Sequence, residues 1–162
     1  TITKTYGNEQ GLSATFRQWR ADSHCRFLHG YALGFEVTIA CNDDNLDARN
    51  WVYSFGGFKP FKAWLQDTFD HKTVVAEDDP QLEVFMQLSM TDTSHGGHTM
   101  LQLRVVEAVG CEKFAKMAYD KMQELIDADP ADKHRVQLLS VKCFEHAGNA
   151  ATYHGSDFRG NL

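Results

Sequence analysis

The chain has 162 residues, 43% of them hydrophobic, which is enough to bury the core of one domain. Its formal net charge is −6 and no basic stripe appears, which argues against a nucleic-acid partner because binding to phosphates needs clustered Lys and Arg. The apolar runs fall far short of a membrane span and the first residues lack a signal-peptide pattern, so we expect a single domain over residues 1–162 and no membrane partner.

Three strands are predicted in the first part of the chain. Residues 11–18 alternate weakly between apolar and polar side chains, whereas residues 29–41 alternate strictly. The strict pattern is typical of a half-buried antiparallel strand. Its apolar face comprises Leu33, Phe35, Val37, Ile39 and Cys41. Residues 51–55 are expected to form a third, short strand that ends at a pair of glycines.

Two helices are predicted in the middle of the chain. A proline suits the first turn of a helix over residues 60–69, and an Asp-His dipeptide at 70–71 follows directly. An Asp-Pro dipeptide at 79–80 begins the second helix. Residues 91–99 are expected to form a polar loop, and residues 100–106 are a candidate strand.

A long helix and a long strand are predicted in the last part of the chain. The helix begins at residues 110–112, and apolar residues recur along one of its sides every three or four positions. Residues 135–145 alternate as a strand, and Glu145 continues the apolar row, which is a costly place for a carboxylate without a partner. The elements together predict an α+β domain with a mainly antiparallel β-sheet and helices packed on one face.

The four cysteines form no CxxC pair, which excludes a zinc knuckle and a thioredoxin motif. They indicate reduced thiols in a reducing compartment, so we expect a cytoplasmic protein. Cys41 and Cys143 continue apolar strand patterns and are interpreted as core residues. Cys25 has polar neighbours instead. Together with the Asp-His pair and the lone carboxylate, its thiol makes a plausible acid–base and nucleophile set.

The order of these pieces resembles the 6-pyruvoyltetrahydropterin synthase and 6-carboxytetrahydropterin synthase family, which has the tunnelling fold. The matching pieces are Phe16 in the first strand, Cys-x-x-x-His-Gly at 25–30, Phe-Gly-x-x-Lys at 55–59, Asp70-His71, the helix that starts at Glu112, and Phe144-Glu145. The spacing between the cysteine and the histidine of the second piece is closer to the carboxy-forming branch of the family, which feeds 7-deazaguanine synthesis.

The resemblance implies a role for each matching residue. Cys25 matches the catalytic cysteine, which transfers protons at the substrate side chain. Asp70 and His71 match the dyad that works with this cysteine from a neighbouring subunit. Glu145 matches the carboxylate that anchors the pterin ring, and Glu112 matches an acidic residue that lies near the pterin.

The resemblance also implies zinc, but the ligand positions depart from the family pattern. His29 matches the first histidine of the His-Gly-His pair, whereas the second is Tyr31. The family's Phe-x-x-x-His appears as residues 16–20 without a histidine, so two of three ligands are absent. The candidate replacements are His24, His95 and His98. Three interpretations stay open: zinc on His29 with His24 or a loop histidine, no metal with His29 bonded locally, or the permanent charge of Arg20 in place of the metal.

Each candidate residue also has a purely structural interpretation. Cys25 could be an idle exposed thiol. His71 could cap the end of the helix, where a cation meets the helix dipole. Glu145 could pair with a Lys or Arg at the end of its strand. These alternatives make different demands on the fold, so the positions of the side chains discriminate between them.

The resemblance therefore implies a lyase that converts 7,8-dihydroneopterin triphosphate to 6-carboxytetrahydropterin, a step toward queuosine. It implies a homohexamer as well, in which two stacked trimers close into a barrel with sites between subunits. Such closure pairs the exposed edges of a small sheet. Two alternatives remain: a 6-pyruvoyltetrahydropterin synthase, and a non-catalytic protein that binds a pterin or purine through Glu145.

Overall fold

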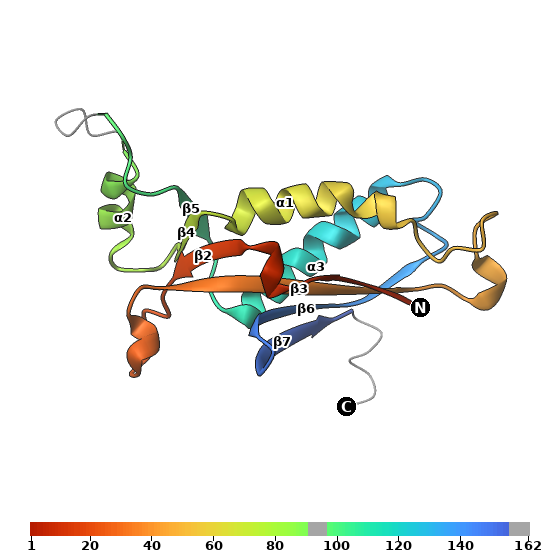
Figure 1. Ribbon diagram of the computed structural model, residues 1–162, viewed down its shortest axis with the longest axis horizontal. Helices are drawn as coiled ribbons and strands as arrows, with labels where there is room; N and C mark the ends of the chain where they lie inside the picture. The colour runs from red at the N-terminus through yellow and green to blue at the C-terminus, as the bar shows by residue number, and fades with distance from the viewer. Residues whose placement is uncertain (91–96, 156–162) are drawn as a thin grey trace.

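The computed structural model describes residues 1–90 and 97–155 (Figure 1). The strands are β1 (Ile2–Tyr6), β2 (Leu12–Phe16), β3 (His29–Ala40), β4 (Lys72–Ala76), β5 (Leu103–Val106), β6 (Gln137–His146) and β7 (Asn149–His154). The α-helices are α1 (Lys59–Phe69), α2 (Leu82–Leu88) and α3 (Cys111–Ala128). No helix in these described ranges is long and apolar enough to cross a membrane.

The described strands form one sheet in the order β5-β4-β2-β3-β6-β7. The long strand β3 organises the sheet, because β2 pairs with its first half and β1 pairs with its second half. The pairs around β3 and the β6–β7 hairpin are antiparallel, as predicted, whereas β4 pairs parallel to β2 and β5 parallel to β4. The sheet is therefore mixed, and the sequence analysis did not predict that β4 and β5 would add to it in parallel.

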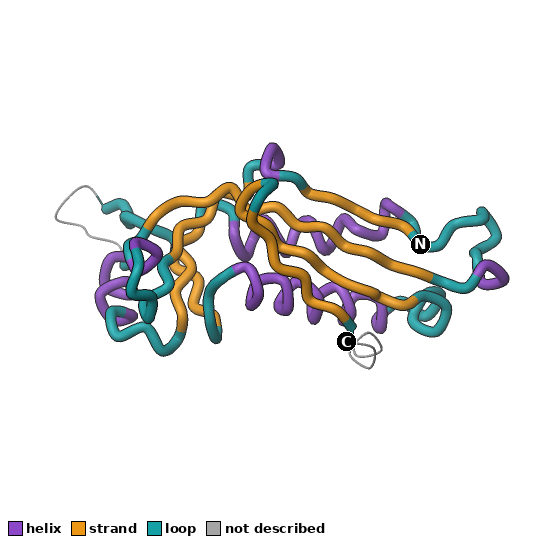
Figure 2. Tube along the Cα trace, turned by 90° about the horizontal axis from the view of Figure 1, so that it is seen from below, coloured by secondary structure: helices purple, strands orange, loops and turns teal. Residues whose placement is uncertain are grey.

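Helices α1 and α3 lie on the same face of the sheet, which confirms the predicted layering (Figures 1 and 2). The apolar face of β3 is buried against them, since Leu33, Phe35, Val37 and Ile39 are all fully buried. Aromatic contacts join the layers: the ring of Phe69 on α1 lies 5.2 Å from that of Phe35 and 5.0 Å from that of Phe114 on α3. Burial of this apolar surface is the main stabilising term of the fold.

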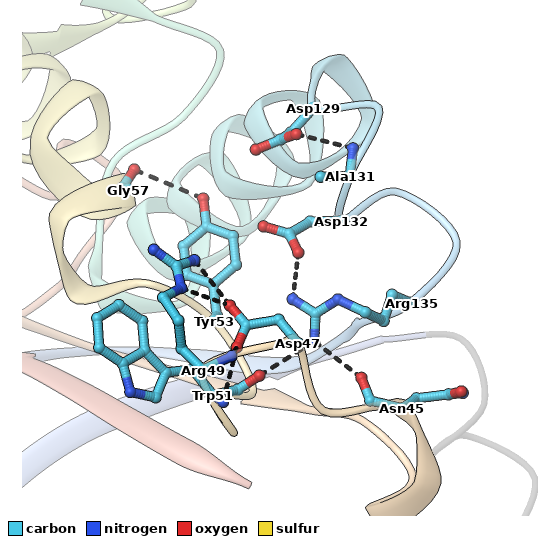
Figure 3. Close-up of polar contacts among 10 residues, drawn as sticks. All are labelled: Asn45, Asp47, Arg49, Trp51, Tyr53, Gly57, Asp129, Ala131, Asp132 and Arg135. Atoms are coloured by element: carbon cyan, nitrogen blue, oxygen red, sulfur yellow. Dashed lines mark hydrogen bonds and ion pairs between the residues drawn. The ribbon is translucent and has the colours of Figure 1, made fainter.

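Residues 51–55 do not form the predicted strand. The carboxylate of Asp47 accepts hydrogen bonds from the backbone N–H groups of Arg49 and Trp51, which turns the chain here and lowers the pKa of Asp47 to about 2 (Figure 3). Arg135 then donates to the backbone carbonyl of Trp51. Both backbone groups of Trp51 thus bond to side chains, and the segment leads into a short 3-10 helix, Phe55–Phe58.

The other predicted elements are found close to their expected positions. The strand expected at 11–18 is β2, that at 29–41 is β3, that at 100–106 is β5, and that at 135–145 is β6. The helices expected from 60, 80 and 111 are α1, α2 and α3. Of the polar loop at 91–99, residues 91–96 lie outside the described residues.

Candidate active site

A cavity of about 370 Å³ lies where the end of β2, the start of β3, the N-terminus of α3 and the β6–β7 hairpin meet. Three of the predicted site residues line it: Cys25, Glu112 and Glu145. Their positions in the chain are far apart, so only the folded sheet brings the thiol and the two carboxylates together. The cavity is also lined by residues that the sequence analysis did not select, including Gln18, Tyr31 and Cys111.

Cys25 is held at the cavity by its backbone. It lies in a short 3-10 helix, His24–Arg26, rather than on β3. Its N–H donates to the hydroxyl of Ser23 (3.3 Å), and its carbonyl accepts from the N–H of Gln18 (2.9 Å). These two bonds anchor a half-buried thiol that faces the cavity. Cys25 is thus half-buried beside the cavity rather than fully exposed.

Glu145 reaches the cavity through an irregularity in the sheet. The pairing of β6 with β7 shifts register between Phe144 and His146, which leaves Glu145 as the extra residue of a bulge. Bulges redirect a side chain and are common beside active sites. No Lys or Arg in residues 1–90 and 97–155 forms an ion pair with Glu145. Its half-buried carboxylate is therefore available to a ligand.

The start of α3 forms a second wall. Gly110 precedes the helix with φ 114°, a conformation that favours glycine, and a Cβ on it would lie 2.4 Å from the amide nitrogen of Gln18. That amide donates to the carbonyl of Val109 (2.9 Å). Glu112 follows in the first turn of α3, where the helix dipole stabilises negative charge. The turn thus presents a carboxylate beside the cavity.

Two thiols meet beneath this wall. Cys143 is fully buried on β6, as predicted, and burial raises the pKa of its thiol. A hydrogen bond from Cys143 lowers the pKa of Cys111, which is half-buried and lines the cavity. Cys41, the other predicted core cysteine, is half-buried just after β3 and packs against the core. Position 111 gave no signal in the sequence beyond its place before Glu112.

Asp70 and His71 lie in close contact but do not line this chain's cavity. Asp70 ends α1 as its C-cap, and its Oδ1 lies 2.9 Å from Nδ1 of His71 and accepts from the N–H of Ser13. The N–H of His71 donates to the carbonyl of Ser13 (2.7 Å), and φ at His71 is 57°. The imidazole side chain is 81% exposed. The capping residue is thus Asp70, and its carboxylate orients an imidazole that faces outward.

The residues at the expected zinc positions do not make a metal site. The ring Nδ1 of His29 lies 2.7 Å from the carbonyl oxygen of Phe27, and its Nε2 lies 2.5 Å from the hydroxyl of Tyr31. Phe16 pairs with His29 across β2 and β3, and its ring stacks on Tyr31 at 4.1 Å. His29 is thus bonded locally, and the side chain that faces it from β2 is a phenylalanine.

The proposed substitutes for the missing ligands lie elsewhere. Arg20, which the sequence analysis offered as one of three possibilities at the missing-ligand position, pairs with Asp78 (2.9 Å) and does not line the cavity. His24 and His98 are exposed and do not line it either, and His95 lies outside the described residues. Across residues 1–90 and 97–155, no group of three His, Cys, Asp or Glu side chains could hold a metal. The described donors therefore do not fit zinc.

Comparison with known proteins places the chain in a family. The family model for 6-pyruvoyl tetrahydropterin synthase matches residues 6–156. A 6-carboxy-5,6,7,8-tetrahydropterin synthase from Rickettsia typhi is 37% identical over 59 residues, which cover 36% of this chain and 41% of that protein. The homologous enzyme of Rickettsia bellii is 34% identical over the same length. These matches span less than half of the relatives' length.

Solved structures share the fold at low sequence identity. An uncharacterized protein from Wolinella succinogenes has a TM-score of 0.70 and 17% identity, and the alignment covers 96% of this chain and 97% of that one. The 6-pyruvoyl tetrahydropterin synthase of Plasmodium vivax has a TM-score of 0.63 and 12% identity, with 95% and 97% covered. Since the family model covers nearly the whole chain and these structures share its tunnelling fold, the protein belongs to the 6-pyruvoyl tetrahydropterin synthase family.

Proposed function

We propose that the protein is a lyase that converts 7,8-dihydroneopterin triphosphate to 6-carboxytetrahydropterin. The observation that carries the proposal is an ionisable carboxylate, Glu145, that has no described cation partner and lines the same cavity as the thiol of Cys25. A pterin presents adjacent N–H donors on its pyrimidine edge, and one carboxylate can accept both in a charge-assisted pair. The names of the two Rickettsia relatives support the carboxy-forming reaction.

Each residue then has a distinct task. Glu145 orients the heterocycle, which positions the substrate side chain near the thiol of Cys25 for proton transfer. Glu112 lies on the α3 side of the same cavity. Asp70 and His71 do not line the cavity of their own chain, so we propose that they complete the cavity of a neighbouring copy. A homohexamer built from two trimers would supply that neighbour.

The biological setting is part of the same proposal. A carboxylated tetrahydropterin serves as a precursor of 7-deazaguanine, the base of queuosine, so we place the reaction in that route. The four cysteines are all free thiols, which suits a cytoplasmic enzyme.

A binding protein without catalysis is the second candidate. Tyr31 and Arg20 favour it, because they stand where the family pattern has two of its three zinc histidines. The close Asp70-His71 pair and the anchored Cys25 favour the enzyme, since a binder needs neither. A synthase that forms the 6-pyruvoyl product instead is a variant of the first candidate.

Turnover and binding measured on the same protein separate these candidates. We would incubate the purified chain with 7,8-dihydroneopterin triphosphate and identify the product by mass spectrometry, which distinguishes the carboxy from the pyruvoyl compound. The Cys25→Ala variant should bind pterin but form no product. Cys41→Ala is the matched control, because this half-buried thiol does not line the cavity. Pterin binding without product in the wild type would support the binder and end the lyase proposal.

A further inference from the structure

Three side chains from two strands converge around His29, which matches a zinc histidine of the family pattern. His29 and Tyr31 are two residues apart on β3, so they project from the same face. Phe16 lies opposite His29 on β2, and its ring stacks nearly parallel on that of Tyr31, with 14° between the planes. The cluster thus consists of an imidazole, a phenol and a phenyl ring. Phe16 and Tyr31 line the cavity together with Cys25.

The hydrogen bonds of this cluster show which atoms carry the protons. The carbonyl of Phe27 can only accept, so the Nδ1 of His29 carries the proton of their 2.7 Å bond. In the neutral imidazole the lone pair is then on Nε2, and the hydroxyl of Tyr31 donates to it. The nitrogen that would ligate a metal is therefore already occupied. The oxygen of Tyr31 keeps its own lone pairs, which remain available to a second donor.

The position of the phenol suits it to this role. Tyr31 lines the same cavity as Cys25 and Glu145. A phenol keeps its proton at neutral pH, because its ordinary pKa is about 10, whereas a metal ligand would have to lose it.

We propose that Tyr31 is a catalytic residue of this protein and that its hydroxyl, bonded to His29, relays a proton from a hydroxyl of the bound substrate in place of a metal ion. The inference rests on the proposed lyase function. The substrate O–H donates to the Tyr31 oxygen; as that proton moves to Tyr31, the tyrosine's own proton moves to Nε2 of His29. The substrate is left as an alkoxide and His29 as an imidazolium, so protons and charge balance. The reverse transfer returns the proton later in the cycle.

Kinetics of one conservative variant test the relay. Tyr31→Phe removes only the hydroxyl and keeps the ring that stacks on Phe16. We expect kcat to fall about 10²–10⁴-fold, the usual contribution of a positioned acid–base group, with a much smaller change in KM. Tyr53→Phe is the matched control, because Tyr53 is buried outside this cavity and should keep wild-type kcat. A Tyr31→Phe variant with wild-type kcat would refute the relay alone.

Metal analysis provides a readout that does not depend on activity. After dialysis against EDTA, the wild-type protein should contain far less than one zinc per chain, and added zinc should not raise its turnover. Phe16→His combined with Tyr31→His adds two imidazoles around His29 and should bind zinc in a one-to-one titration. Tyr31→His alone is the fallback if the loss of buried Phe16 prevents folding, and it should bind zinc more weakly.

Other outcomes show whether the relay or the lyase function is wrong. Stoichiometric zinc in the wild type, with turnover lost in EDTA and restored by zinc, would refute metal-free catalysis. Pterin binding without any turnover would refute the lyase, and the relay with it. Product formation by wild type in EDTA, together with a large loss in Tyr31→Phe, would support both.

Discussion

Replacing Glu145 by glutamine tests the interaction that orients the substrate. The carboxylate is presented by the β6 bulge and has no ion-pair partner among the described residues. Glutamine keeps the shape and one acceptor oxygen, but it loses the charge and puts an amide donor against a pterin N–H. A hydrogen bond to a charged group contributes about 1.5–3 kcal/mol, so the Glu145→Gln variant should bind pterin roughly 10–150-fold more weakly.

Calorimetric titration with a pterin would measure this loss, alongside thermal unfolding of each variant. Glu124→Gln is the control, because Glu124 is exposed on α3 and bonds only to Lys121 among the interactions described (2.9 Å). The unfolding temperature of Glu145→Gln should not fall, since no described cation loses a partner. An affinity within about twofold of the wild type would refute the assignment of Glu145 as the pterin anchor.

Three further predictions concern the core, an internal ion pair and the assembly. Phe114→Ala should lower the free energy of unfolding by about 3–5 kcal/mol in urea, because this ring is fully buried between the two layers. Burial raises the pKa of Asp79, but the hydrogen bonds from Arg17 at 2.6 and 2.9 Å outweigh it and the pKa is lowered. Because the pKa of Asp79 is lower in the folded than in the unfolded chain, its ionised form stabilises the fold at pH values above the unfolded pKa of 3.8. This contribution is lost as the pH falls through the folded pKa. The Asp79→Asn variant should therefore have a lower free energy of unfolding at pH 7, and that free energy should depend less on pH in acid. Refolding Cys25→Ala together with His71→Ala should restore activity at about a quarter of the sites if cavity and dyad come from different subunits, whereas no recovery would contradict shared sites.

Local sequence patterns predicted the strands and helices that bury one face and expose the other, because such elements repeat apolar residues at a regular spacing. The alternation in 29–41 became β3 because one face of that strand packs on the helices and the other does not. Strand β4 was missed for the converse reason: nearly all of its residues are buried, and a short continuous apolar run has no period to detect. The segment 51–55 failed as a strand because Asp47 and Arg135 bind its backbone, and Arg135 is distant in sequence.

The sequence by itself determined the family, the layering of helices on a sheet, and the residues Cys25, Glu112 and Glu145 that the cavity unites. Only the tertiary structure decided which side chain faces His29 from the neighbouring strand. The sequence pattern assigned the missing zinc ligand to position 20, whereas the β2–β3 register pairs Phe16 with His29. Register depends on pairing between residues that are not neighbours in the chain, and a shift alters every cross-strand contact. The sequence therefore predicts which chemical groups are present, while the sheet decides which of them meet.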